Sequence, residues 1–147
     1  MTLVSLMPAA GSHRLSRLYR HLALWVLQSW LAMFYIAAGY AKLTQPQEML
    51  AALMIWPADA SLRTIRVIGW VELSLAVGMV IPLISWSLFR RTMQLACIGL
   101  MVEAVLMAIY HAAGLHLGLA FVNSALAVMS LVVIMGRVRG EVDQREP

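Results

Sequence analysis

The stretch LALWVLQSWLAMFYIAAGYA, residues 22–41, runs for twenty residues without a charged side chain. A helix of about 20 apolar residues is long enough to cross the hydrocarbon core of a bilayer. The stretch exceeds the apolar region of a cleaved signal peptide, which is about 7–15 residues long. We therefore predict a retained transmembrane helix at residues 22–41.

Three further apolar runs of similar length follow, at residues 64–86, 93–112 and 115–135. The last two are separated only by a short connection near Ala113 and Gly114, so these two helices must be antiparallel neighbours. The predicted fold is all-α: an integral membrane four-helix bundle with up-down-up-down topology.

The sequence divides into three parts around this bundle. Residues 22–136 are predicted to form the transmembrane domain, preceded by a basic N-terminal segment at 1–21 and followed by a polar tail at 137–147. A shorter apolar segment lies at 46–56, with Pro46 suited to a first helical turn and Pro57 ending it. We expect a short interfacial or re-entrant helix there, and a simple connector is the alternative.

Composition supports a lipid environment. The chain is 62% hydrophobic and 12% charged, whereas a soluble domain is about half apolar and about a quarter charged. The net charge of +4 comes from basic residues at the edges of the apolar runs, where lipid headgroups and topology require them. We therefore expect contact with the lipid bilayer and no binding of nucleic acid.

The basic residues also predict the orientation. Of the eleven Lys and Arg residues, only Lys42, Arg63 and Arg66 fall on one side of the predicted bundle. Because cytoplasmic loops carry the excess of Lys and Arg, both termini and the loop at Arg90 and Arg91 are predicted to be cytoplasmic.

Polar and small residues recur on one face of each predicted helix. Since polar groups facing hydrocarbon are costly and small residues permit close helix contact, these faces should point into the bundle. The four faces comprise Gln28, Ala32, Tyr35, Gly39 and Lys42; Gly69, Glu72, Ala76 and Met79; Ala96, Gly99, Glu103, Met107 and Tyr110; and His116, Ala120, Asn123, Ala127 and Ser130.

Ionisable residues inside a membrane are functional candidates. The predicted catalytic residues are Glu72, Glu103 and His111, because two carboxyl groups and an imidazole can transfer protons. The alternative is structural: a Lys42–Glu72 or His111–Glu103 contact that locks the helices, or a Lys42 side chain that reaches the interface. The predicted ligand-binding residues are Tyr35, Lys42, Trp70, Tyr110 and Asn123, with membership of an interfacial aromatic belt as the alternative for Trp70.

Several cofactor classes are not expected. The lone cysteine, Cys97, permits no internal disulfide. A haem with two histidine ligands needs facing imidazoles on separate helices, whereas His111 and His116 flank a tight turn. The 11 methionines are dispersed, so no copper site, or any other metal site, is predicted.

Several short motifs resemble those of the DoxX-like family. The resemblance covers residues 22–137, and its motifs are YIAAGYAKL at 35–43, RVIGWVEL at 66–73 with Gly78 and Pro82, Met101–Ala104 with His111, and Gly136 with Arg137. It implies a small bacterial four-helix protein of the inner membrane, with Lys42, Glu72 and His111 as its polar signature. Glu103 departs from the family pattern.

The resemblance also implies an auxiliary subunit of a membrane redox system, with an oxidoreductase partner and a quinone or other small amphiphile as ligand. Two alternatives follow from the residues themselves: an acid–base enzyme, such as an isomerase, that uses Glu72 and Glu103, and a proton-coupled carrier. The carrier would require a homo-oligomer, because one four-helix bundle is thin for a gated path.

Overall fold

The computed structural model describes the backbone of residues 9–83 and 86–145, and the side-chain surroundings of residues 15–82 and 91–139. The described chain is all-helical and contains no strand. Its helices are α1 (Ala9–Thr44), α2 (Gln47–Met54), α3 (Leu62–Val80), α4 (Trp86–Ala113) and α5 (Leu117–Arg145), with short 3-10 turns η1 (Trp56–Ala58) and η2 (Ile81–Leu83).

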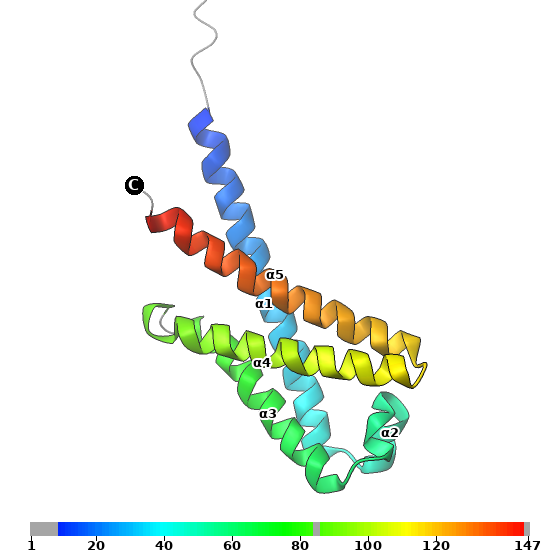
Figure 1. The fold of residues 1–147 in the computed structure, drawn as a ribbon. Helices are drawn as coiled ribbons and strands as arrows, with labels where there is room; N and C mark the ends of the chain where they lie inside the picture. Colours follow the sequence, from blue (N-terminus) through cyan, green and yellow to red (C-terminus); the bar gives the residue numbers. More distant parts are fainter. Residues whose placement is uncertain (1–8, 84–85, 146–147) are drawn as a thin grey trace, which may run out of the picture.

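The long helices contact one another in a closed order. α1 packs against α3 and α5, α3 packs against α4, and α4 packs against α5. Figure 1 shows the α4–α5 hairpin lying obliquely across the α1–α3 pair, with α2 near the turn that joins α4 to α5. The short helix expected between the first two long helices is therefore present, as α2.

Three of the helices are long and apolar enough to cross a membrane: Leu15–Thr44, Arg91–Ala113 and Leu117–Arg139. The remaining long helix, α3, carries Arg63, Arg66 and Glu72 within its 19 residues. These charges lower its hydropathy, so α3 as a fourth membrane-spanning helix stays a prediction.

Several helix ends differ from the predicted ones. α1 already begins at Ala9, so most of the basic N-terminal segment continues the first helix, and α5 runs past Met135 to Arg145. Helices need not end where the hydrocarbon ends, because Arg, Gln and Glu are good helix formers. Conversely, α3 ends at Val80 and not at Trp86, since Pro82 has no N–H to donate to the helix ladder.

The polar and small faces predicted for α1 and α3 are buried. Every member of those two faces, from Gln28 to Lys42 and from Gly69 to Met79, lies in the interior. On α4 the buried face is rotated by about one residue relative to the prediction, because Leu100, Ala104 and His111 are buried whereas Tyr110 is exposed.

Two glycines bring α1 and α3 into close contact. A Cβ on Gly39 would lie 2.9 Å from the carbonyl oxygen of Gly69, and a Cβ on Gly69 would lie 2.9 Å from Cβ of Lys42. Side chains at these positions would force the two backbones apart. The contact thus sets the spacing of the helices that carry Lys42 and Glu72.

We predict that Gly39→Ala destabilises the protein by about 1–3 kcal/mol, because the added methyl group overpacks the α1–α3 contact. The matched control is Gly118→Ala, since a Cβ on Gly118 meets nothing within 4 Å. Thermal unfolding in detergent measures both variants. Equal midpoints for the two would contradict the assigned contact.

Candidate functional site

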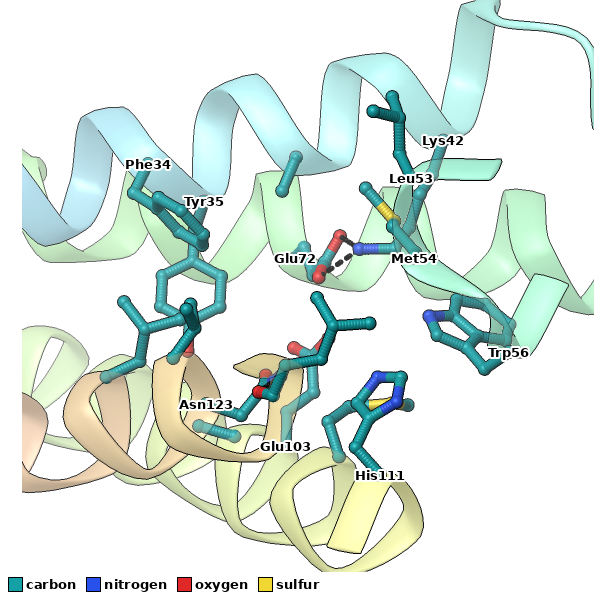
Figure 2. Close-up of a pocket in the computed structure, with 16 residues that line it drawn as sticks. Phe34, Tyr35, Lys42, Leu53, Met54, Trp56, Glu72, Glu103, His111 and Asn123 are labelled. Carbon is teal, nitrogen blue, oxygen red and sulfur yellow. Dashed lines mark hydrogen bonds and ion pairs between the residues drawn. The ribbon is translucent and has the colours of Figure 1, made fainter. Parts of the chain in front are cut away.

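A cavity of about 230 Å³ lies between the helices, and all five of them contribute to its wall. Its lining is mostly apolar, with six polar or ionisable side chains among sixteen residues (Figure 2). The polar ones are Tyr35, Lys42, Glu72, Glu103, His111 and Asn123, and the apolar ones are Phe34, Ala38, Leu53, Met54, Trp56, Ala104, Met107, Leu119, Val122 and Leu126.

Lys42 on α1 and Glu72 on α3 form a buried ion pair. The Lys42 ammonium donates to both carboxylate oxygens of Glu72, at 2.5 Å and 2.6 Å (Figure 2). The two residues are only 4% and 2% exposed. Breaking such a pair from one side leaves an uncompensated charge, so the pair fixes the register of α1 against α3.

Arg66, six residues before Glu72 on α3, supports this pair by binding the end of α1. Its guanidinium donates to the backbone carbonyl of Lys42 and, at 3.0 Å, to that of Gln45. Carbonyls in the last turn of a helix have no partner within the helix. Arg66 therefore caps the end of α1 that presents Lys42 to the cavity.

Glu103 faces the cavity from α4, on the side opposite the ion pair (Figure 2). Its Oε2 atom is buried and has no hydrogen-bond partner among the described residues. Leaving a buried polar group unsatisfied costs about 1–3 kcal/mol. A bound molecule that hydrogen-bonds Oε2 would recover this free energy.

His111 lies two turns further along α4 and is also buried. The tight turn after it fixes its position: the backbone N–H of His116 donates to the His111 carbonyl at 2.8 Å, and Leu115 adopts a positive φ of 59°. The Nδ1 atom of His111 has no hydrogen-bond partner in the described structure. The cavity thus presents a second unsatisfied polar atom.

Tyr35 and Asn123 complete the polar lining. The Tyr35 hydroxyl donates to the backbone carbonyl of Leu100 at 3.3 Å, which links α1 to α4. The Asn123 side-chain amide donates to the Leu119 carbonyl at 2.8 Å within α5. Both hydrogen bonds hold these side chains at the cavity wall.

Two predicted ligand-binding residues, Trp70 and Tyr110, do not line the cavity. Trp70 is 62% exposed, because two residues along a helix turn a side chain by about 200° away from Glu72. Tyr110 lies on the outside of α4, where its hydroxyl donates to Asp59 Oδ2 at 3.1 Å. The other predicted residues, Tyr35, Lys42, Glu72, Glu103, His111 and Asn123, share the cavity.

None of the predicted site residues lies on α2 or η1, although Leu53, Met54 and Trp56 line the cavity. The chain turns between α2 and η1 at Ile55, whose φ is 65°, and Pro57 lies within η1. Trp56 is buried.

A second polar cluster pins α1 to α5 far from the cavity. The Gln28 side chain donates to the Met79 carbonyl at 2.6 Å and accepts from Arg137 at 2.9 Å. The Arg137 guanidinium also lies over the Trp25 ring, 4.4 Å from its centroid. Arg137, the first residue of the predicted polar tail, is buried, because α5 continues through it.

The chain was compared with known proteins. A family model described as the DoxX-like family matches residues 26–135. This segment contains every residue that lines the cavity. Neither the curated proteins nor the solved structures gave a match.

We predict that Lys42→Met destabilises the protein by about 3 kcal/mol or more, because it strands a buried carboxylate. The double variant Lys42→Met, Glu72→Leu should regain most of that loss, since two apolar side chains can replace a buried ion pair. Thermal unfolding in detergent compares the two. A double variant less stable than the single one would argue against the pairing.

Proposed function

The chain belongs to the DoxX-like family of membrane proteins, and we propose that it is an auxiliary subunit of a membrane redox system. In this proposal the cavity holds a quinone-like or other small amphiphile. Electrons for a redox-active ligand would come from a partner protein in the same membrane.

One observation carries the proposal: a mostly apolar cavity contains two buried polar atoms, Glu103 Oε2 and His111 Nδ1, that have no hydrogen-bond partner among residues 15–82 and 91–139. Ligand sites are typically apolar, with a few polar groups that fix orientation. A molecule with an apolar ring and oxygen substituents meets both requirements. The ring would occupy the apolar wall. Its carbonyl oxygens would accept from a protonated Glu103 carboxyl group and from the N–H tautomer of His111 Nδ1, and the hydroxyl groups of its reduced form would donate to the same atoms when these are unprotonated.

The size of the cavity favours a small head group. Drug-sized ligands occupy pockets of about 300–1,000 Å³, and an apolar cavity of about 150 Å³ holds one benzene molecule. The volume of about 230 Å³ therefore suits one substituted ring. A bulky fused cofactor would not fit without displacement of α2.

The ion pair of Glu72 favours a ligand-binding function of the cavity over acid–base catalysis by Glu72. Both of its oxygens already accept from Lys42, so proton transfer by Glu72 would require breaking a buried ion pair. Glu103 has no such commitment at Oε2. The two carboxyl groups therefore play different roles: Glu72 holds the helices, and Glu103 contacts the ligand.

We further propose that α3 crosses the membrane with α1, α4 and α5 in an up-down-up-down bundle. Its charges support this arrangement because Glu72 is neutralised by Lys42 and Arg66 is bound to backbone carbonyls. The distribution of Lys and Arg supports an orientation with both termini in the cytoplasm, and the family resemblance implies a bacterial inner-membrane protein.

The main alternative is an intramembrane acid–base enzyme, such as an isomerase of an apolar substrate. The observation that favours it is the buried Oε2 atom of Glu103, which has no hydrogen-bond partner in the described structure and lies in a mostly apolar cavity, where a positioned carboxyl group can transfer a proton. Turnover of an apolar substrate that survives Glu103→Gln would exclude this function.

We predict that Glu103→Leu weakens binding of a short-chain benzoquinone by about tenfold, because one hydrogen bond is worth about 1.4 kcal/mol. Isothermal titration in detergent measures the affinity. Trp70→Leu is the control, since Trp70 lies on the outside of α3. Equal affinities for wild type and Glu103→Leu would contradict the assigned contact.

We also predict that the protein, purified in mild detergent from its native membrane, carries an oxidoreductase subunit with it. Native mass spectrometry of the complex identifies the partner. Full quinone-reducing activity of the isolated chain would contradict the auxiliary role.

A further inference from the structure

We propose that the cavity is loaded sideways from the bilayer, through an opening between α1 and α5, and that its ligand carries an apolar tail. This inference rests on the proposed function, because it specifies the class of amphiphile that the same cavity takes. The ligand is a lipid-like molecule with an oxygen-bearing head, and a small water-soluble molecule is excluded.

The opening is marked by residues that line the cavity and are also exposed on the protein surface. These are Phe34 of α1, Leu53 of α2 and Val122 of α5, which are 37%, 58% and 43% exposed. All three are apolar. The passage from the outside into the cavity therefore presents a surface that suits hydrocarbon.

The opening lies at hydrocarbon depth. Phe34 and Val122 belong to the candidate membrane spans of α1 and α5. With a rise of about 1.5 Å per residue, Phe34 lies about 15 Å from the Thr44 end of α1, and Val122 about 8 Å from the start of α5. Acyl chains of the surrounding lipid meet this rim, whereas bulk water does not.

The relative course of α1 and α5 accounts for the gap. The two helices touch at Leu24 and Gly136, where a Cβ on the glycine would lie 2.6 Å from the leucine side chain. From that contact they diverge toward α2 (Figure 1). The cavity lies in the divergent half.

The other helix pairs around the cavity are closed. α1 and α3 touch through Gly39 and Gly69, and α3 meets α4 where a Cβ on Gly99 would lie 2.9 Å from Leu75. α4 and α5 are joined by the tight turn after His111. None of these boundaries offers an exposed cavity-lining side chain comparable to the α1–α5 rim.

Apart from Leu53, which borders the opening, the end of the cavity beside α2 is closed. Leu50 of α2 is buried, and so are Trp56 and Pro57 in the segment that joins α2 to α3. Gln47 holds this segment by donating to the carbonyls of Pro57 and Ala60, both at 2.9 Å. Tyr110 fastens it to α4 through Asp59. A water-soluble ligand would have to displace these contacts.

The polarity of the cavity changes from the rim inward. The rim is apolar, whereas the unpaired Glu103 Oε2 and His111 Nδ1 atoms are buried. An amphiphile entering from the bilayer would place its oxygen-bearing head against these atoms. Its tail would remain between Phe34 and Val122, in contact with lipid.

Cysteine labelling tests the route without any knowledge of the ligand. In the Cys97→Ala background, Ala38→Cys places a thiol on the cavity wall. In liposomes, a long-chain alkyl maleimide dissolved in the bilayer should label this thiol several-fold faster than a charged, water-soluble thiosulfonate reagent. Adding Val122→Trp should slow the alkyl reagent.

Val128→Trp is the matched control, because Val128 is exposed on α5 but does not line the cavity. Leu53→Trp at the same rim provides a second blocking variant, and thermal unfolding confirms that each variant is folded. Equal labelling by the two reagents would overturn the lateral route. So would unchanged alkyl labelling in both blocking variants.

A series of quinones with one head and different tails tests the ligand class. A decyl-substituted benzoquinone should bind more than about tenfold tighter than its methyl analogue, because only the longer tail reaches the apolar rim. Val122→Trp should weaken only the decyl compound. Equal affinities for the two compounds would contradict the inference that the ligand carries an apolar tail. The proposed head-group site would be unaffected.

The reverse result is also informative: the rim variants could slow labelling by the alkyl maleimide while neither quinone binds. It would support the lateral opening and contradict the quinone-like ligand of the proposed function. The two inferences therefore fail in different experiments.

Discussion

The ion pair between Lys42 and Glu72 is the interaction on which the rest of the structure depends. Both charges are withdrawn from water, so each is tolerable only beside the other. The close approach of Gly39 and Gly69 brings α1 and α3 near enough for the pair to form, and Arg66 holds the end of α1 from which Lys42 projects. Replacing the two glycines by larger residues would push α1 and α3 apart. The Lys42 ammonium and the Glu72 carboxylate would then be buried without a partner.

This arrangement makes the two buried glutamates unequal, although the sequence presents them alike. Both oxygens of Glu72 accept from the Lys42 ammonium, so Glu72 links α3 to α1. Glu103 lies across from it on α4, and its Oε2 atom has no hydrogen-bond partner among the described residues. His111 Nδ1 likewise has no partner in the described part of the chain, whereas the Tyr35 hydroxyl donates to Leu100. Both of these cavity residues with a partnerless polar atom therefore lie on one helix, α4.

Much of the site could be predicted from periodicity, because a polar side chain on an apolar helix is costly in lipid and therefore faces the other helices. The inward faces of α1 and α3 followed from spacing alone, and the Lys42–Glu72 contact was one of the alternatives that the sequence offered. Periodicity could not predict how deeply individual side chains are buried or which distant residues they contact. Trp56 and Trp70 look alike in sequence, yet Trp56 is buried in η1 and Trp70 lies on the outside of α3. Arg137 resembles a solvated tail residue until Gln28 and Trp25, more than a hundred positions earlier, are seen to receive it.

The cluster of Gln28, Arg137 and Trp25 has a mechanical consequence for the whole molecule. It joins α1 to α5 near one end of their contact, and the sixteen residues from Val122 to Arg137 span about 22 Å along α5. A rotation of α5 by about 5° around this cluster would displace Val122 by about 2 Å. Small rotations about the cluster would therefore change the separation of α1 and α5 mainly at the rim of the cavity.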